Sequence, residues 1–257
     1  GDINIKQSNK QSTGTTMNAQ QEYEARMHFM RIFDTFCTQN SLTWSLYGDF
    51  LRHFLSNIPT KDTTMTFAMK GVNFRGIPLS TEQVILKMND VIKLMEMIGM
   101  VRRKTHISDA TTIFDVEVLN SDNSRVRFPI FIYCGTTLYQ PFSCDSVSLT
   151  PAGLIVSKHA DVDYFNNSFG VALLQRMFEL KTKCVKPLKS YVNEPQNRNS
   201  RLENVSMIYK ENTLLKEGFT IDGPHLHIEQ DANENAGSSA SNNDVCAICF
   251  EESRQTK

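Results

Sequence analysis

The stretch 46–67, LYGDFLRHFLSNIPTKDTTMTF, carries the strongest local signals in this 257-residue sequence. It begins inside a short apolar run, 42–47, which predicts a β-strand that stops at Gly48. The apolar spacing over 50–56 predicts a short helix, and a proline follows it. Apolar and smaller residues then alternate over 63–69, which predicts a second strand. The stretch is therefore expected to form a strand, a tight turn, a helix and a strand.

Further elements are expected on both sides of this stretch. Apolar residues at three- and four-residue steps predict an amphipathic helix over 18–39. Ser80 and Gln83 form a capping box, which predicts a helix over 80–97 that ends at Gly99. The remaining patterns predict strands at 112–119, 125–133, 146–149 and 153–156, and helices at 164–180 and 198–217.

This order of elements predicts an α+β domain over residues 17–228, with a mixed or antiparallel sheet flanked by helices and a helical C-terminal part. Both ends of the chain are expected to be disordered tails. Residues 1–16 are polar and read as a lead-in, and residues 229–244 are acidic and small and read as a flexible linker. Residues 245–257 form a separate terminal segment.

Composition excludes some classes of function. Hydrophobic residues make up 40% of the chain and the formal net charge is −1, so neither a general nucleic-acid coat nor a polybasic membrane binder is expected. No run approaches the roughly 18 apolar residues of a membrane span, and residues 1–16 lack an apolar signal core. The protein is therefore expected to be intracellular and cytoplasmic, without a membrane partner. Four cysteines lie among apolar residues and are expected to be buried thiols: Cys37, Cys134, Cys144 and Cys184.

The stretch 46–67 resembles the core motif of the DNA-polymerase-beta-like nucleotidyltransferases, especially the tRNA-nucleotidyltransferase and poly(A)-polymerase branch. In that motif an apolar strand leads to two small residues, a helix with Arg-Asp, and an Asp-x-Asp on the next strand. Gly48, Arg52 and Asp62 stand at matching positions. The resemblance implies a nucleotidyltransferase-like mixed sheet, with a nucleotide-binding site at Gly48, Asp49 and Arg52.

The chemistry of that family explains the motif. Small residues let a helix N-terminus approach a triphosphate, where the amide dipoles hold negative charge. Carboxylates hold two Mg²⁺ ions for in-line phosphoryl transfer, and hydroxyls are poor substitutes as ligands. The sequence departs from the family at these positions. Asp49 replaces the second small residue, His53 replaces the acid after the arginine, Thr64 replaces the second metal carboxylate, and the strand 125–133 contains no acid.

Two acids on the neighbouring predicted strand offer an alternative. Asp115 and Glu117 point to the same face of 112–119 and, together with Asp62, are the candidate catalytic carboxylates that would hold Mg²⁺ if the chain is active. Exposed acids on a strand are more often solvated surface, and Asp62 is more often a turn residue. For Arg52, a structural ion pair is the alternative to a functional role.

Later segments add to the resemblance. Residues 141–150 and 197–221 are similar to parts of uncharacterised nucleotidyltransferase-like proteins of large DNA viruses, so the resemblance covers about 40–222. The basic segment 181–189 is expected to be a solvated helix end, with contact to a nucleic-acid backbone as the alternative.

The terminal segment Asp244-Val-Cys-Ala-Ile-Cys-Phe-Glu-Glu252 resembles the opening of a RING-type zinc finger. Cys246 and Cys249 have the spacing of a first Zn²⁺ ligand pair. No cysteine or histidine follows Cys249, so we expect an incomplete zinc site that gains Zn²⁺ only in a complete RING. The resemblance implies that Ile248 would contact a ubiquitin-conjugating enzyme in the full-length form. The alternative is an unpaired tail.

Three functions follow from these patterns. The first is a non-catalytic binding module, the substrate-recognition part of a RING-containing viral protein, with a protein partner. The second is an active metal-dependent nucleotidyltransferase that uses the atypical carboxylates Asp62, Asp115 and Glu117. The third is a virion-associated structural protein, found in a virus factory or virion. Nucleic acid stays open as a partner in the first two.

Overall fold

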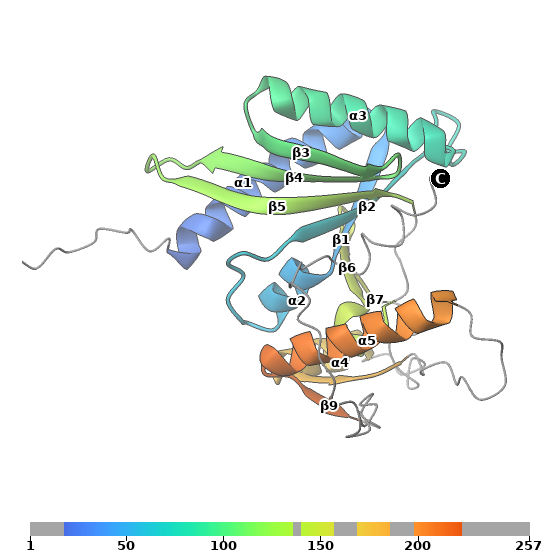
Figure 1. Cartoon of the computed structure of the whole chain (residues 1–257). Coiled ribbons are helices and arrows are strands. Elements are labelled where there is room, and N and C mark those ends of the chain that lie inside the picture. Colours follow the sequence, from blue (N-terminus) through green and yellow to red (C-terminus); the bar gives the residue numbers. More distant parts are fainter. Residues whose placement is uncertain (1–17, 136–139, 157–168, 186–197, 223–257) are drawn as a thin grey trace, which may run out of the picture.

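The computed structural model describes residues 18–135, 140–156, 169–185 and 198–222. These residues form a seven-stranded mixed sheet with helices against it, and a second, two-stranded sheet (Figure 1). The strands are β1 (Leu42–Tyr47), β2 (Met65–Gly71), β3 (Val101–Ser108), β4 (Thr111–Leu119), β5 (Arg125–Cys134), β6 (Val147–Thr150), β7 (Gly153–Val156), β8 (Lys181–Lys183) and β9 (Thr220–Asp222). The helices are α1 (Ala19–Gln39), α2 (Asp49–Leu55), α3 (Thr81–Met97), the short 3-10 helix η1 (Ser143–Asp145), α4 (Phe169–Phe178) and α5 (Arg198–Lys216).

The large sheet has the strand order β3-β4-β5-β2-β1-β6-β7. β2 and β5 run parallel, with Met65 opposite Ile130, and every other neighbouring pair is antiparallel. The predicted α+β class with a mixed sheet is confirmed. The pairing places β5 directly beside β2, where the family pattern expects the strand with the third carboxylate.

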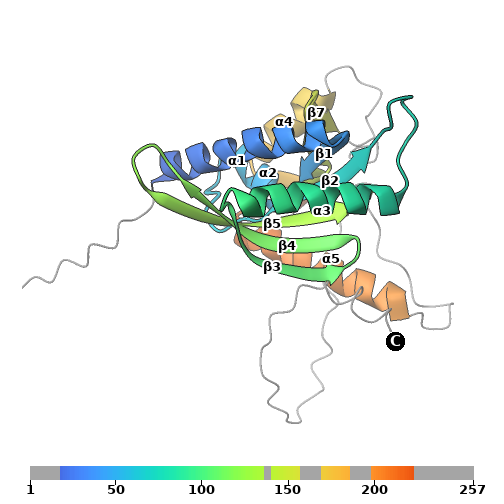
Figure 2. The same ribbon diagram turned by 90° about the horizontal axis from the view of Figure 1, so that it is seen from above.

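One face of the sheet is covered by α1 and α3 (Figure 2). Alternating residues of β2 point to this face, and Met65, Phe67 and Met69 are fully buried there. The ring of Phe67 lies 4.7 Å from the ring of Phe33 on α1. The predicted alternation over 63–69 therefore marks the core side of β2. The helices α4 and α5 lie at the other end of the molecule, away from α3 (Figure 1).

The capping box predicted for α3 is present, since Ser80 accepts from the amide of Gln83 and the Gln83 side chain accepts from the amide of Ser80. β3 is a strand that the sequence patterns did not predict. Its residues 102–106 are all exposed, so no apolar alternation marks it. The basic residues Lys181–Lys183 form β8 rather than the expected helix end, because they pair with β9.

Several predicted segments lie outside the described residues. These are the lead-in 1–16, the start of the helix at 164–180, the linker 229–244 and the terminal segment with Cys246 and Cys249. Within the ranges that the structure covers, no helix has the length and apolar character needed to cross a membrane.

Arg26 of α1 fixes the turn that leads into β2. Its side chain is fully buried, and the guanidinium lies 4.5 Å from the ring centre of Phe50 and 4.7 Å from that of Phe128. It forms a salt bridge of 2.9 Å with Glu22. Its Nη2 donates to the backbone oxygens of Thr60, at 3.1 Å, and Thr63, at 3.0 Å. Burial outweighs the Glu22 contact and lowers the pKa of Arg26.

Replacing Arg26 by Ala should therefore cost about 3–5 kcal/mol of unfolding free energy, the usual range when one partner of a buried ion pair is removed. Urea unfolding of the two chains measures this difference. Arg31→Ala is the matched control, because Arg31 is exposed on the same helix, and it should change the stability by about 0.5 kcal/mol or less. Equal effects of the two substitutions would show that Arg26 does not hold the turn.

Candidate functional site

Gly48 connects β1 to α2 through a backbone conformation that favours glycine. Its φ is +82° and its ψ is −150°. A Cβ atom there would lie 3.5 Å from Oγ1 of Thr66, an ordinary contact, so the positive φ and not the space requires glycine. The amide of Phe50 donates to the carbonyl oxygen of Thr64 at 3.3 Å and ties the start of α2 to the start of β2.

Gly48, Asp49 and Arg52, the expected nucleotide-binding residues, lie together at the start of α2. The Arg52 side chain is fully buried and is surrounded by carboxylates of this chain. Nη1 donates to Oδ1 of Asp145 at 2.5 Å. Nε and Nη2 donate to the two carboxylate oxygens of Glu217 at 2.9 and 2.7 Å, which is a bidentate pair. Nη2 also lies 3.1 Å from Oδ1 of Asp49.

Lys210 of α5 completes the cluster. Its Nζ lies 3.2 Å from Oδ1 of Asp49 and 3.2 Å from Oδ2 of Asp145. The contact with Asp145 lacks the alignment of a hydrogen bond, so it is electrostatic. The Asp145 side chain is fully buried. We call Asp49, Arg52, His53, Asp145, Lys210 and Glu217 the Arg52 cluster.

The pKa values in the Arg52 cluster follow from burial and from these contacts. Burial opposes the charge of Arg52, but Asp145 and Glu217 outweigh it and raise the pKa of Arg52 above its usual value. Lys210 shows the same balance, and its pKa is raised beside Asp145. Burial opposes the charge of Glu217, but His53 and Arg52 lower its pKa to about 2. The pKa of Asp49 is lowered in the same way by Lys210 and Arg52, against the effect of burial.

The Arg52 cluster joins segments that are far apart in the sequence. Arg52 is on α2, Asp145 is in η1, Lys210 is on α5 and Glu217 follows α5. Arg52 and Lys210 face three carboxylates, so a protonated His53 brings the sum of charges to zero. A phosphate would have to displace Asp145 or Glu217 to reach Arg52. The cluster thus acts as an internal ion-pair network.

The candidate catalytic carboxylates do not converge. Asp62 is exposed in the turn before β2, with a φ of +63°. Asp115 and Glu117 lie on β4, and β5 separates β4 from β2. Two strand spacings amount to about 9.5 Å. Among the described residues, no three His, Cys, Asp or Glu side chains form a group that could hold a metal ion.

Glu117 is also engaged by cations. Arg127 Nε lies 2.5 Å from one carboxylate oxygen of Glu117, and Arg102 and Arg125 approach the other at 3.2 and 3.6 Å. The hydrogen bond from Arg127 is the main reason that the pKa of Glu117 is lowered. Asp115 lies opposite Arg102 on β3 and Pro129 on β5.

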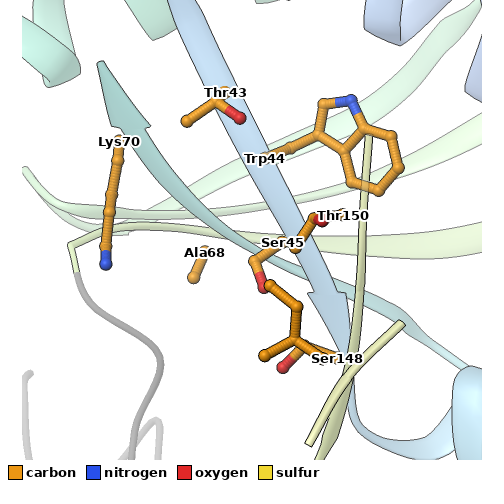
Figure 3. A pocket seen from close by; sticks show the side chains of 8 residues that line it. Thr43, Trp44, Ser45, Ala68, Lys70, Ser148 and Thr150 are labelled. Carbon is orange, nitrogen blue, oxygen red and sulfur yellow. The ribbon is translucent and has the colours of Figure 1, made fainter. Parts of the chain in front are cut away.

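The sheet face that carries Thr66 opens into a hollow of about 280 Å³ (Figure 3). Its floor has small side chains, Ser45 of β1 and Ala68 of β2, flanked by Thr43 and Ser148. Among the described residues of the lining, Lys70 is the single charged one. Hydroxyls and an ammonium group suit a polar or anionic molecule, whereas Mg²⁺ requires carboxylate oxygens.

The buried thiols are confirmed for Cys37, Cys134 and Cys144, and Cys184 is half-buried. Burial raises the pKa of the Cys134 thiol to about 11. The expected zinc ligands Cys246 and Cys249 lie outside the described residues.

No protein-family model matches the chain, and no curated protein is significantly similar to it. Among solved structures, the chain is similar to nucleotidyltransferase-fold enzymes that add CCA. The apo form I of a CCA-adding enzyme is 10% identical, with a TM-score of 0.47, over 77% of this chain and 40% of that one. A complex of CCA-adding enzyme with CTP gives 13% identity, a TM-score of 0.47 and the same shares. The Thermotoga maritima CCA-adding enzyme complexed with tRNA is 12% identical, with a TM-score of 0.47, over 80% of this chain and 41% of that one. The chain spans about two fifths of the length of these enzymes.

His53 predicts how stability depends on pH. Its Nδ1 lies 2.7 Å from the carbonyl oxygen of Pro59 and its Nε2 lies 2.8 Å from Oε1 of Glu217, so both nitrogens face acceptors. Burial opposes the charge, but these hydrogen bonds raise the pKa of His53. Because the pKa of His53 is higher in the folded state than in the unfolded state, protonation of His53 stabilises the fold. This stabilisation is complete below the unfolded-state pKa of about 6.5 and is lost as the pH rises through the folded-state pKa.

The unfolding free energy of the wild type relative to His53→Gln should therefore be larger at pH 6 than at pH 9. Glu217 stays ionised throughout this range, since its pKa is about 2. Urea unfolding of both chains at the two pH values measures the difference. His28→Gln, which changes an exposed histidine of α1, should show no such pH dependence. If the difference in unfolding free energy between the wild type and His53→Gln is the same at both pH values, protonated His53 does not stabilise the fold by pairing with Glu217.

Proposed function

We propose that this chain is a non-catalytic binding module with a nucleotidyltransferase-like fold. The observation that carries the proposal is the Arg52 cluster. The arginine at the motif position is fully buried and donates to Asp145 and Glu217 at 2.5 to 2.9 Å. In an active enzyme with this motif, the arginine at this position would meet a phosphate. In this chain, the guanidinium of Arg52 instead has a structural role.

The strands beside the Gly48 turn support the same proposal. Thr64, which directly precedes β2, and Thr66 of β2 share a face with the turn and carry hydroxyls instead of carboxylates. On β5, the register partner of Thr66 is Phe131, and β5 contains no acid. Two-metal phosphoryl transfer needs several carboxylate oxygens around hard cations. Transfer at this position therefore has too few ligands.

The partner that we propose for this module is a protein. In a longer protein with a complete RING, this chain would be the substrate-recognition part of a RING-containing viral protein. Cys246 and Cys249 would be the first zinc ligands of the finger. A ubiquitin-conjugating enzyme would then bind the finger of the full-length form. This part of the proposal rests on the sequence 244–252 and on the viral-type resemblance of 141–150 and 197–221.

An active nucleotidyltransferase is the second candidate. One observation favours it. Asp115 of β4 lies opposite Pro129 of β5, and Pro129 is next to Ile130, the partner of Met65 on β2. By this register, the side chain of Asp115 lies on the same face of the sheet as those of Thr64 and Thr66. Asp62, Asp115 and Glu117 would have to move together and Glu117 would have to leave three arginines.

A transfer assay separates the two candidates. The purified chain is incubated with Mg²⁺, labelled ATP or CTP and an RNA primer, and calorimetry follows Mg-ATP binding. We expect neither incorporation nor a Mg²⁺-dependent binding heat, because the ligand set is incomplete. Asp90→Asn is the matched control for Asp62→Asn, since Asp90 is an exposed acid on α3. Incorporation that Asp62→Asn abolishes and Asp90→Asn preserves would overturn the proposal.

A further inference from the structure

A second concave surface lies at the end of α3, away from the Gly48 turn. It is a groove of about 350 Å³ between α1, the 98–100 connection, β3 and β4. Its lining is mixed: Ile32, Ile98 and Leu119 are apolar, Arg102 and Arg125 are basic, and His28 and Glu117 also line it. Leu119 and Arg125 are direct neighbours across the β4–β5 ladder. We call it the Leu119 groove. Its volume is near the lower end of ligand pockets, which run from about 300 to 1,000 Å³, so it suits one or two side chains.

Apolar side chains in the lining of the Leu119 groove are exposed. Ile98 is 53% exposed and Leu119 is 58% exposed, and the neighbouring Met97 is 82% exposed. Isolated exposed apolar residues are ordinary, but a group of them around one hollow marks an interaction surface. Since burial of apolar area gives most of the free energy of association, these residues favour an apolar side chain as occupant.

The charged residues in and beside the groove have a surplus of positive charge. Arg102, Arg125 and Arg127 all approach the carboxylate of Glu117, at 3.2, 3.6 and 2.5 Å. Arg127 lies beside the groove rather than in its lining. With Asp115, which lies opposite Arg102, counted beside Glu117, the three guanidinium groups leave a net charge of one. The three arginine side chains are 50%, 71% and 64% exposed, whereas Glu117 is 7% exposed. Each guanidinium has five N–H donors, so donors remain free to receive carboxylates.

We propose that the Leu119 groove binds an acidic, apolar peptide segment of a partner protein. An apolar side chain of the segment lies against Ile98 and Leu119, and flanking carboxylates pair with Arg102 and Arg125. The proposal rests on the binding role proposed above in expecting a protein partner, but it uses none of the residues of the Arg52 cluster.

A nucleic acid fits the groove less well. Single-stranded nucleic acids are held by aromatic side chains that stack on bases, together with a basic groove. The described lining of the Leu119 groove holds aliphatic side chains and no Phe, Tyr or Trp, so a phosphate backbone would use the arginines and leave Ile98 and Leu119 in water. Charge complementarity together with the aliphatic side chains therefore favours the acidic, apolar peptide.

Fluorescence anisotropy with labelled synthetic peptides tests the proposal on the full chain. The probe is Glu-Phe-Leu-Glu-Asp, and the comparison peptides are Glu-Ser-Ser-Glu-Asp and Lys-Phe-Leu-Lys-Lys. We expect the probe to bind and both comparison peptides to bind at least about tenfold more weakly, a loss of about 1.4 kcal/mol or more. Binding of the probe should weaken with salt, because exposed charges are screened.

Two variants locate the binding. Arg125→Glu and Leu119→Asp should each weaken the probe about tenfold or more, and both residues are exposed, so the fold is retained. Arg75→Glu is the matched charge control. Arg75 is exposed before the first turn of α3, and the 17-residue helix separates it from Ile98 by about 25 Å. Arg75→Glu should leave the affinity unchanged.

Several results would overturn the proposal: no binding of the probe, equal binding of Glu-Ser-Ser-Glu-Asp, or tighter Arg125-dependent binding of a single-stranded oligonucleotide. A dimer in sedimentation velocity that Leu119→Asp dissolves would place a second copy in the groove and would also overturn it. Nucleotide transfer is measured on the same samples. Transfer together with probe binding refutes only the non-catalytic proposal, and loss of probe binding without transfer refutes only the peptide groove.

Discussion

The buried guanidinium of Arg52 is the constraint on which the C-terminal half of this structure depends. A buried cation is costly unless an opposite charge pairs with it and hydrogen bonds engage its donors. Asp145 and Glu217 supply those carboxylates, and Lys210 and His53 balance them. Because Asp145 precedes β6 and Glu217 follows α5, the buried charge of Arg52 ties both segments to α2.

The same interaction bears on function. The contacts between Arg52 and Glu217 occupy donors of the arginine that a phosphate would need at this position. The hollow on the same sheet face offers hydroxyls and Lys70, which suit polar ligands, and among the described residues no three carboxylates, histidines or cysteines gather in a group that could hold a metal ion. The strand, glycine turn and helix that the sequence predicts at 42–56 are all present.

Local patterns were sufficient for much of the fold. The turn at Gly48, the capping box of Ser80 and Gln83, and the strands β4 and β5 were all predicted, because each depends on neighbours in sequence. β3 was missed, since its residues 102–106 are exposed and leave no apolar period. The role of Arg52 stayed open because its partners Asp145 and Glu217 lie 93 and 165 residues away. The separation of Asp62 from Asp115 and Glu117 likewise depends on β5 lying between their strands, which no local pattern reports.

A double-mutant cycle tests most directly whether Arg52 is held by this chain. Unfolding free energies are measured by urea for the wild type, Arg52→Met, Glu217→Gln and the double variant. If Arg52 and Glu217 form the bidentate buried pair described above, their coupling energy should be about 2–3 kcal/mol, the upper part of the range for residues in one network. Additive effects, with a coupling energy below about 0.5 kcal/mol, would mean that Arg52 is free of Glu217 and available to a ligand.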